Sequence, residues 1–121
     1  MNLNEMATCV TNNLPVKIFV MNNNALGMVR QWQEIFYGKR YSSTILNRKT
    51  DYVKLADAFG GTGFTIASKE DIAPVIKEAL ETPGPVIVDC RIATEDLVLP
   101  MIPPGGTNKD IIFTRAQIDN K

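Results

Sequence analysis

Three short apolar runs, separated by segments of helical spacing, constrain the fold of this chain more than any other feature. The runs occupy residues 16–21, 64–67 and 85–90, and each has the length and composition of a buried strand. Between them, and before the first, apolar side chains recur every three or four positions, which indicates amphipathic helices. Strands that alternate with helices in this way predict an α/β fold with a parallel sheet.

The helical spacing predicts four helices, over about residues 3–12, 28–36, 52–59 and 71–81. Thr50 or Asp51 is expected to cap the third of them. Because proline is tolerated in the first turn of a helix, Pro74 places the start of the fourth near Asp71 rather than at Ser68.

Two stretches lack this periodicity. Residues 38–50 are basic and rich in Ser and Thr, and we expect a loop there. After the last apolar run no sustained period returns, and the prolines and glycines of residues 100–106 exclude a regular element. This tail either packs as an arm or is a disordered terminus.

The charges of the chain cancel, with 13 basic and 13 acidic side chains among 121 residues. A neutral surface offers no footprint for nucleic acid or for an anionic membrane, so neither is an expected partner. Without a long apolar segment or a secretion signal, we expect a cytoplasmic protein. Cys9 and Cys90 lie in apolar surroundings, which predicts buried, reduced thiols rather than a redox or metal pair.

Histidine is absent from the sequence, which removes the commonest general base and the commonest ligand of transition metals. Chemistry in this protein would therefore depend on a bound cofactor or on groups from another chain. For that reason we assign no catalytic residue, and Asp89 on the last strand is interpreted as structural.

The triplet Asn22–Asn24 follows the first predicted strand, at the edge of the sheet where parallel α/β folds bind ligands. Asparagine side-chain oxygens are neutral, hard ligands of the kind that Mg²⁺ accepts beside phosphate and water. Asparagine is also a common turn and cap residue, so the triplet alone leaves both interpretations open.

The longer sequence that begins with this triplet is more informative about function. Residues 22–33 read Asn-Asn-Asn-Ala-Leu-Gly-Met-Val-Arg-Gln-Trp-Gln, which closely resembles the second half of the thiamine-diphosphate motif as acetolactate synthases carry it. The resemblance continues through residues 36–42, 51–56, 84–86 and 98–106. It covers essentially the whole chain, and the Gln-Trp and Pro-Met-Ile-Pro strings narrow it to this family among thiamine-diphosphate enzymes.

The resemblance implies a three-layer sandwich with a parallel sheet, the thiamine-diphosphate-binding fold. Residues 1–92 would form part of that α/β domain, and residues 93–121 the C-terminal arm that covers the active site. The implied activity of the parent enzyme condenses pyruvate with a second 2-oxo acid, pyruvate or 2-oxobutyrate, with loss of CO₂ in branched-chain amino-acid biosynthesis. The implied cofactors are thiamine diphosphate and Mg²⁺, with FAD bound elsewhere in the parent.

The resemblance also assigns roles to single residues around the start of the second helix. Asn23 would supply a side-chain oxygen to Mg²⁺, and Ala25 a backbone carbonyl. Gly27 and Met28 would lie beside the cofactor, where backbone N–H groups and the helix dipole favour phosphate.

Further along the same helix, the resemblance places Val29 and Trp32 in the substrate pocket. A flat apolar wall there would reward one more methylene in the acceptor. The alternative, from spacing alone, is that Met28, Val29, Trp32 and Phe36 form an ordinary stripe facing a core.

Part of the family's site has no counterpart in these 121 residues. The first glycine is Gly27, so no Gly-Asp pair precedes Asn22 to supply the metal-binding aspartate. We therefore expect a fold that is incomplete on its N-terminal side, a weak half of a metal site, and a chain inactive alone. An exposed sheet edge would favour a homo-oligomer. Whether a regulatory small subunit binds stays open.

Two alternatives to an acetolactate synthase remain. One is a non-catalytic, cofactor-binding fragment. The other is part of a different thiamine-diphosphate enzyme, such as pyruvate oxidase, glyoxylate carboligase or a 2-oxo acid decarboxylase. Trp32 and the Pro-Met-Ile-Pro tail favour acetolactate synthase over the latter.

Overall fold

The computed structural model of the chain describes residues 2–46 and 50–119, and divides them between two compact units. Of these residues, the first unit comprises 2–23 and 50–92, and the second 24–46 and 93–119. In the division expected from the sequence, 1–92 and 93–121, residues 24–46 belonged with the α/β domain, whereas in the structure they group with the C-terminal segment.

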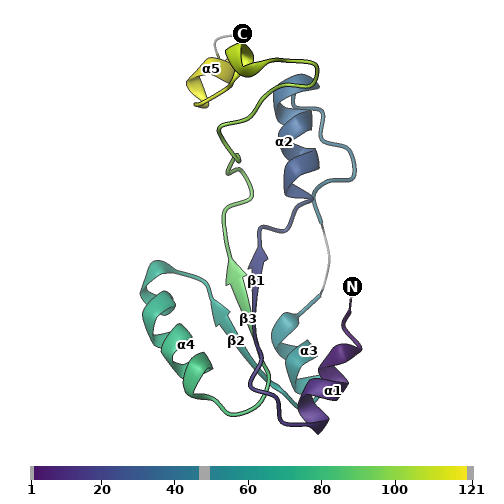
Figure 1. Ribbon diagram of the computed structural model, residues 1–121, viewed down its shortest axis with the longest axis vertical. Coiled ribbons are helices and arrows are strands. Elements are labelled where there is room, and N and C mark those ends of the chain that lie inside the picture. The colour runs from purple at the N-terminus through teal and green to yellow at the C-terminus, as the bar shows by residue number, and fades with distance from the viewer. Residues whose placement is uncertain (1, 47–49, 120–121) are drawn as a thin grey trace. The chain divides into compact units, whose positions relative to one another are not determined.

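A three-stranded parallel sheet forms the centre of the first unit (Figure 1). Its strands are β1 (Lys17–Asn22), β2 (Thr62–Ile66) and β3 (Val86–Arg91), in the order β1-β3-β2. In the register, Phe19 of β1 and Phe64 of β2 both lie opposite Val88 of β3. The apolar runs therefore predicted all three strands, although β2 begins two residues earlier than expected.

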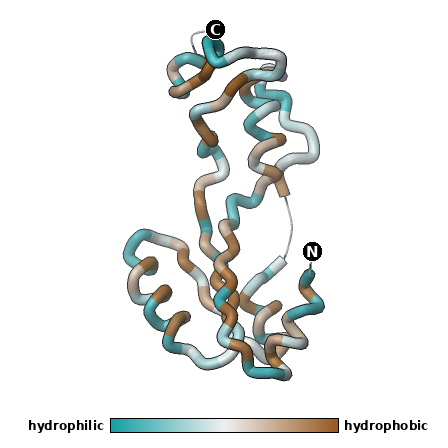
Figure 2. The backbone as a smooth tube through the Cα atoms, in the orientation of Figure 1, coloured by the Kyte–Doolittle hydropathy of each residue, from teal (hydrophilic) through white to brown (hydrophobic). Residues whose placement is uncertain are grey.

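Helices cover both faces of this sheet. The face of β3 that carries Val86, Val88 and Cys90 packs against α4 (Lys69–Glu81). Ile87 points to the opposite face, which is covered by α1 (Glu5–Thr11) and α3 (Tyr52–Ala58). In Figure 1 the sheet lies between α4 and the pair α1 and α3, and in Figure 2 the strands are predominantly brown, the apolar end of the scale. The predicted three-layer α/β sandwich is confirmed.

Side-chain caps determine where the helices of the first unit begin. The Asp51 side chain accepts hydrogen bonds from the backbone N–H groups of Val53 (3.1 Å) and Lys54 (3.0 Å), so one of the two expected caps is confirmed. The expected start of α4 near Asp71 is wrong, because the helix begins at Lys69 with Ser68 as its N-cap.

The reason for this difference is the Asp71 carboxylate. Its Oδ2 accepts from the backbone N–H groups of Ala67 (3.0 Å) and Ser68 (2.9 Å), which stabilises an earlier start. Pro74 consequently lies in the second turn, where its ring removes one helical hydrogen bond to the carbonyl of Glu70. Both residues are exposed, so water can satisfy that carbonyl.

The two cysteines are free thiols, as predicted. Cys90 is buried on β3, and burial, together with the neighbouring Asp89 charge, raises the pKa of its thiol. Cys9 is only half-buried on α1. Among residues 2–46 and 50–119, no helix is both long enough and apolar enough to cross a bilayer.

The Asp71 cap predicts a pH dependence of stability. Its two backbone hydrogen bonds lower the pKa of Asp71 below the ordinary value of 3.8, so the stabilisation is present above that value and is lost as the pH falls through the lower, folded-state pKa. We expect Asp71→Ala to lower the melting temperature at pH 7. The difference between the two proteins should shrink below about pH 4.

Circular dichroism melts between pH 2 and pH 7 test this expectation. Glu81→Ala is the matched control, because it removes a carboxylate from the last turn of the same helix. A loss for Asp71→Ala that stays constant over the whole pH range would contradict the proposed role of its charge.

Candidate functional site

Helix α2 (Gly27–Phe36) belongs to the second unit and begins shortly after the asparagine triplet. Its N-cap is Leu26, which offers no side-chain hydrogen bond, and its first turn contains no acidic residue. The Leu26 backbone N–H donates to the Thr44 carbonyl (2.8 Å), which attaches the preceding residues to segment 44–46. The Leu26 side chain therefore does not cap α2, and the positive dipole at this end of the helix stabilises an anionic group.

The asparagines before α2 have distinct environments. Asn22, at the end of β1, donates from Nδ2 to the Asp89 carboxylate (2.9 Å), which also pairs with Arg91 (3.5 Å). Asp89 therefore joins the ends of two strands of the first unit, which supports its structural interpretation. Asn24 adopts a left-handed backbone with φ of 52°, a conformation that asparagine tolerates better than most residues.

The residues expected to bind Mg²⁺ are Asn23, the last residue of the first unit, and Ala25, which forms an antiparallel bridge with Ile45. Over residues 2–46 and 50–119, no group of three or more His, Cys, Asp or Glu side chains is arranged to hold a metal ion. An amide oxygen and a carbonyl are suitable ligands for Mg²⁺, and their roles here stay predictions.

Helix α2 buries its polar face rather than its apolar one. Arg30, Gln31 and Glu34 are buried, with Gln31 exposed by only 2%. The apolar side chains Met28 and Val29 are half exposed, at 52% and 51%. The stripe on this helix therefore does not face a core in the second unit.

Gln31 explains part of this inversion, because its carboxamide is hydrogen-bonded at both ends. Its Oε1 accepts from the Val98 backbone N–H (2.6 Å), while its Nε2 donates to the Val98 carbonyl (3.1 Å) and contacts the Met101 sulfur (3.1 Å). A buried amide that is satisfied in this way costs little and fixes its partner closely. The C-terminal segment is thus packed on α2 as an arm within this unit.

Glu34 forms the second attachment of that segment. Its two carboxylate oxygens pair with Arg30 Nη1 (2.9 Å) and Arg115 Nη1 (3.0 Å), and Arg115 Nη2 also donates to the Glu95 carbonyl (2.9 Å). The Arg30 guanidinium lies over the Tyr41 ring, 4.7 Å from its centroid. Partial burial, followed by the Glu34 charge, holds the pKa of the Tyr41 hydroxyl above its usual value.

Gln33 attaches the segment that follows α2. Its Nε2 donates to the Ser42 carbonyl (3.2 Å), and its Oε1 accepts from the Ser42 backbone N–H (3.2 Å) and from Thr44 Oγ1 (2.8 Å). Of the loop expected over residues 38–50, residues 47–49 lie outside the described part of the chain. Residues 38–46 contain no helix or strand, as expected from their composition, but they are fixed by these contacts and by the Ala25–Ile45 bridge.

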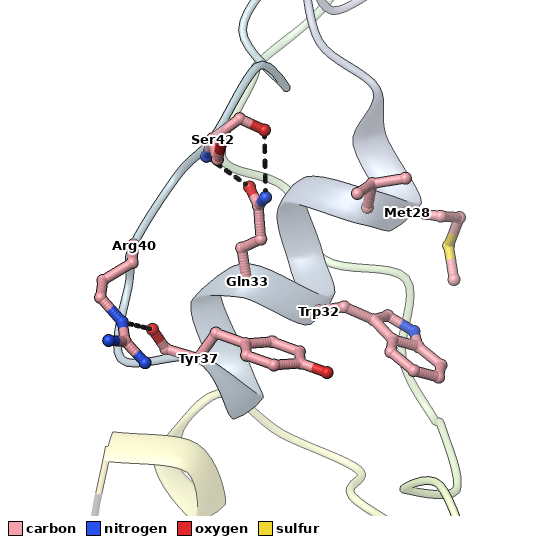
Figure 3. Close-up of a pocket in the computed structure, with 7 residues that line it drawn as sticks. Met28, Trp32, Gln33, Tyr37, Arg40 and Ser42 are labelled. Atoms are coloured by element: carbon pink, nitrogen blue, oxygen red, sulfur yellow. Dashed lines mark hydrogen bonds between the residues drawn. The ribbon is translucent and has the colours of Figure 1, made fainter.

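A pocket of about 580 Å³ lies beside the exposed apolar face of α2 (Figure 3). Ligand sites commonly have volumes of roughly 300–1,000 Å³. Trp32 packs edge-on against Phe36, with ring centroids 5.7 Å apart. The lining residues are Met28, Val29, Trp32, Gln33, Tyr37, Arg40 and Ser42.

Three of the sequence-predicted residues, Met28, Val29 and Trp32, therefore line one pocket, whereas Gly27, the first residue of the helix, is not among its lining residues. Sequence reasoning missed the roles of Arg30, Gln31, Gln33 and Glu34. Polar residues at positions 30 and 34, one helical turn apart, were the only local signal of a buried polar face.

Residues 1–90 match the family model described as the thiamine pyrophosphate enzyme C-terminal TPP-binding domain, thiamine pyrophosphate being another name for thiamine diphosphate. The chain belongs to this family. The match includes β1, β2, the asparagine triplet, the whole of α2, and β3 except for its last residue, Arg91.

Curated relatives confirm the similarity to acetolactate synthase large subunits. The large subunit from Pyropia yezoensis is 42% identical over 113 residues, and acetolactate synthase 1, chloroplastic, from Zea mays is 40% identical over 120 residues. Acetolactate synthase from Mycobacterium bovis is 41% identical over 117 residues. Each alignment covers 93% of this chain but only 19% of the relative, so the chain spans about a fifth of their length.

A solved structure supports the fold independently. The thiamine diphosphate-dependent 4-hydroxybenzoylformate decarboxylase of Rhodococcus jostii RHA1 superposes with a TM-score of 0.66, over 75% of this chain and 17% of that chain. At 24% sequence identity, this likeness is one of fold.

The ion pairs around Glu34 generate a stability prediction. We expect Glu34→Gln to destabilise the second unit by about 3 kcal/mol, because the buried Arg30 loses its counter-charge. Amide hydrogen exchange followed by mass spectrometry should show faster exchange in α2 and in residues 95–115.

Lys54→Gln is the matched control for this variant. It removes one charge from the Lys54–Asp51 pair, which is also local in sequence but largely exposed, so no measurable change is expected. Equal effects of the two substitutions would contradict a special role for the buried network.

Proposed function

We propose that this chain supplies half of the thiamine-diphosphate site and one wall of the acceptor pocket of an acetolactate synthase. The observation that carries this proposal is the geometry of α2. The start of α2 has a positive dipole and a cap residue without a hydrogen-bonding side chain, which favours a diphosphate there. The exposed apolar face that lines the pocket begins at Met28, the second residue of the same helix. Relatives named acetolactate synthase large subunit support the same assignment.

In this proposal each predicted residue has one task. Asn23 Oδ1 and the Ala25 carbonyl bind Mg²⁺, and the backbone N–H groups of Gly27 and Met28 face the diphosphate. Thiamine diphosphate, when bound, supplies the electron sink that allows a 2-oxo acid to lose CO₂ and join a second oxo acid. Val29 and Trp32 orient the acceptor and keep water away from it.

The pocket suits a small oxo acid with an apolar side chain. Its walls are Met28, Val29, Trp32 and the Tyr37 ring, so an added methylene on the acceptor is removed from water. Such a contact discriminates by roughly 1–3 kcal/mol, which suffices to favour 2-oxobutyrate over pyruvate as acceptor.

Several properties of the whole protein belong to this proposal. They are FAD bound outside this segment, a role in valine and isoleucine synthesis, assembly as a homo-oligomer and a cytoplasmic location. Exposed apolar side chains on α2 and the outer edge of β1 support assembly, since each is stabilised by a covering surface. One relative is described as chloroplastic, so the location is a matter for experiment.

The proposal predicts the products of the full-length protein that carries this sequence. With pyruvate and 2-oxobutyrate present, we expect acetolactate and acetohydroxybutyrate, and Trp32→Leu should lower the preference for 2-oxobutyrate about tenfold. Trp32→Phe keeps a flat ring and should retain most of the preference. Acetaldehyde or acetyl phosphate as main product would instead indicate a decarboxylase or an oxidase.

Calorimetric titration of the 121-residue chain with thiamine diphosphate and Mg²⁺ tests the half-site directly. Because the carboxylate ligand expected in the family has no counterpart before Asn22, we expect weak binding. Tight, metal-dependent binding by this chain alone would overturn the half-site.

A further inference from the structure

Two glutamines flank Trp32, and each binds a different segment of the second unit by the same geometry. Gln31 pairs with the backbone N–H and C=O of Val98, and Gln33 pairs with the backbone N–H and C=O of Ser42. In both cases the side-chain carboxamide accepts from the backbone N–H and donates to the backbone C=O of one residue, so it forms the same pair of hydrogen bonds as a residue of a neighbouring β-strand. Only the Gln33 partner, Ser42, lies in the lining of the pocket.

The pocket rim, residues 37–44, has an irregular backbone. It contains no helix or strand. Gly38, Lys39 and Ser43 lie in the left-handed region of the backbone, with φ of 59°, 59° and 54°. Two of these are not glycine, and such residues hold this conformation only where their surroundings enforce it. The residues of the rim would therefore favour other backbone conformations if their tertiary contacts were removed.

Gln33 restrains that rim at several points, in addition to the Leu26–Thr44 backbone hydrogen bond and the contact of the Arg30 guanidinium with the Tyr41 ring. Three hydrogen bonds connect its side chain to Ser42 and Thr44, and its backbone carbonyl accepts from the Lys39 N–H (3.0 Å). Thr44 is 2% exposed, so its hydroxyl has little access to water as an alternative partner. Figure 3 shows the Gln33 side chain reaching Ser42, while Trp32 extends from the same helix and Tyr37 from the residue just after its end.

We propose that Gln33 is a positioning residue of the substrate pocket, because its carboxamide holds the rim against α2 and so fixes the space between Trp32, Tyr37 and Arg40. It acts through the rim rather than on the substrate. The assignment of the pocket to a 2-oxo acid rests on the proposed function, whereas the positioning of the rim does not.

Trp32 is the only tryptophan of the chain, so its fluorescence reports on the pocket without a label. We expect Gln33→Met, which keeps the length of the side chain but removes its polar atoms, to raise the acrylamide quenching constant about twofold. Gln31→Met is the matched control, because Gln31 holds Val98 and Met101 instead of the rim. It should leave quenching unchanged and speed amide exchange at residues 98–101.

Gln33→Glu provides a pH-dependent change in quenching, which a general loss of stability would not produce. A carboxylate cannot donate to the Ser42 carbonyl, so quenching should be raised at pH 7. Once protonated, the carboxyl donates again, and quenching should return towards that of the unmodified chain as the pH falls through the glutamate pKa. Gln33→Met should show no such recovery. Equal quenching in all variants, or a rise for Gln31→Met as large as for Gln33→Met, would refute the proposal.

Activity of the full-length protein separates this inference from the proposed function. We expect Gln33→Met to raise the KM of the acceptor oxo acid several-fold with a smaller change in kcat. If the quenching results hold but no acetolactate forms even in the unmodified protein, the rim is positioned by Gln33 and the proposed function fails. If acetolactate forms but quenching is insensitive to Gln33, the inference alone fails.

Discussion

The polar face of helix α2 is the constraint on which the second unit depends. A carboxamide and a carboxylate, both buried, connect this helix to segments that are remote in the chain, and each of their oxygen and nitrogen atoms has at least one partner. Among the described residues, Arg30 Nε is the one buried side-chain nitrogen or oxygen without a hydrogen bond. Polar contacts are directional, so they fix the rotation of α2 about its axis. That rotation leaves the apolar face exposed, next to the pocket.

The first unit is held together by apolar packing on both faces of its sheet, and its strands were predicted well from the sequence. β3 is apolar on both faces because helices cover both, which makes its strand visible as a continuous apolar run. The start of α4 was predicted from Pro74 alone, without the cap that the Asp71 carboxylate forms. Two hydrogen bonds to backbone N–H groups outweigh one bond lost at an exposed proline.

The second unit was less predictable for a physical reason. The partners of Gln31 lie 67 positions away, and no local periodicity reports on a contact of that range. Spacing alone placed Met28, Val29 and Trp32 on a core stripe, which is the usual fate of an apolar helix face. The family resemblance placed Val29 and Trp32 in a substrate pocket, and the structure brings them together in one cavity whose ligand is still to be measured.

The contrast between an apolar sandwich and a unit fastened by amides and ion pairs has a thermal consequence. Hydrophobic stabilisation weakens on cooling, and a buried ion pair weakens as well because removing its charges from water costs more in the cold, whereas a neutral amide pairing such as that of Gln31 with Val98 depends least on either effect. Cold should therefore loosen the sheet, its helices and the Glu34 ion pairs before it separates Gln31 from Val98. The attachment of the C-terminal segment at Val98 would then persist at temperatures where the apolar unit has begun to open.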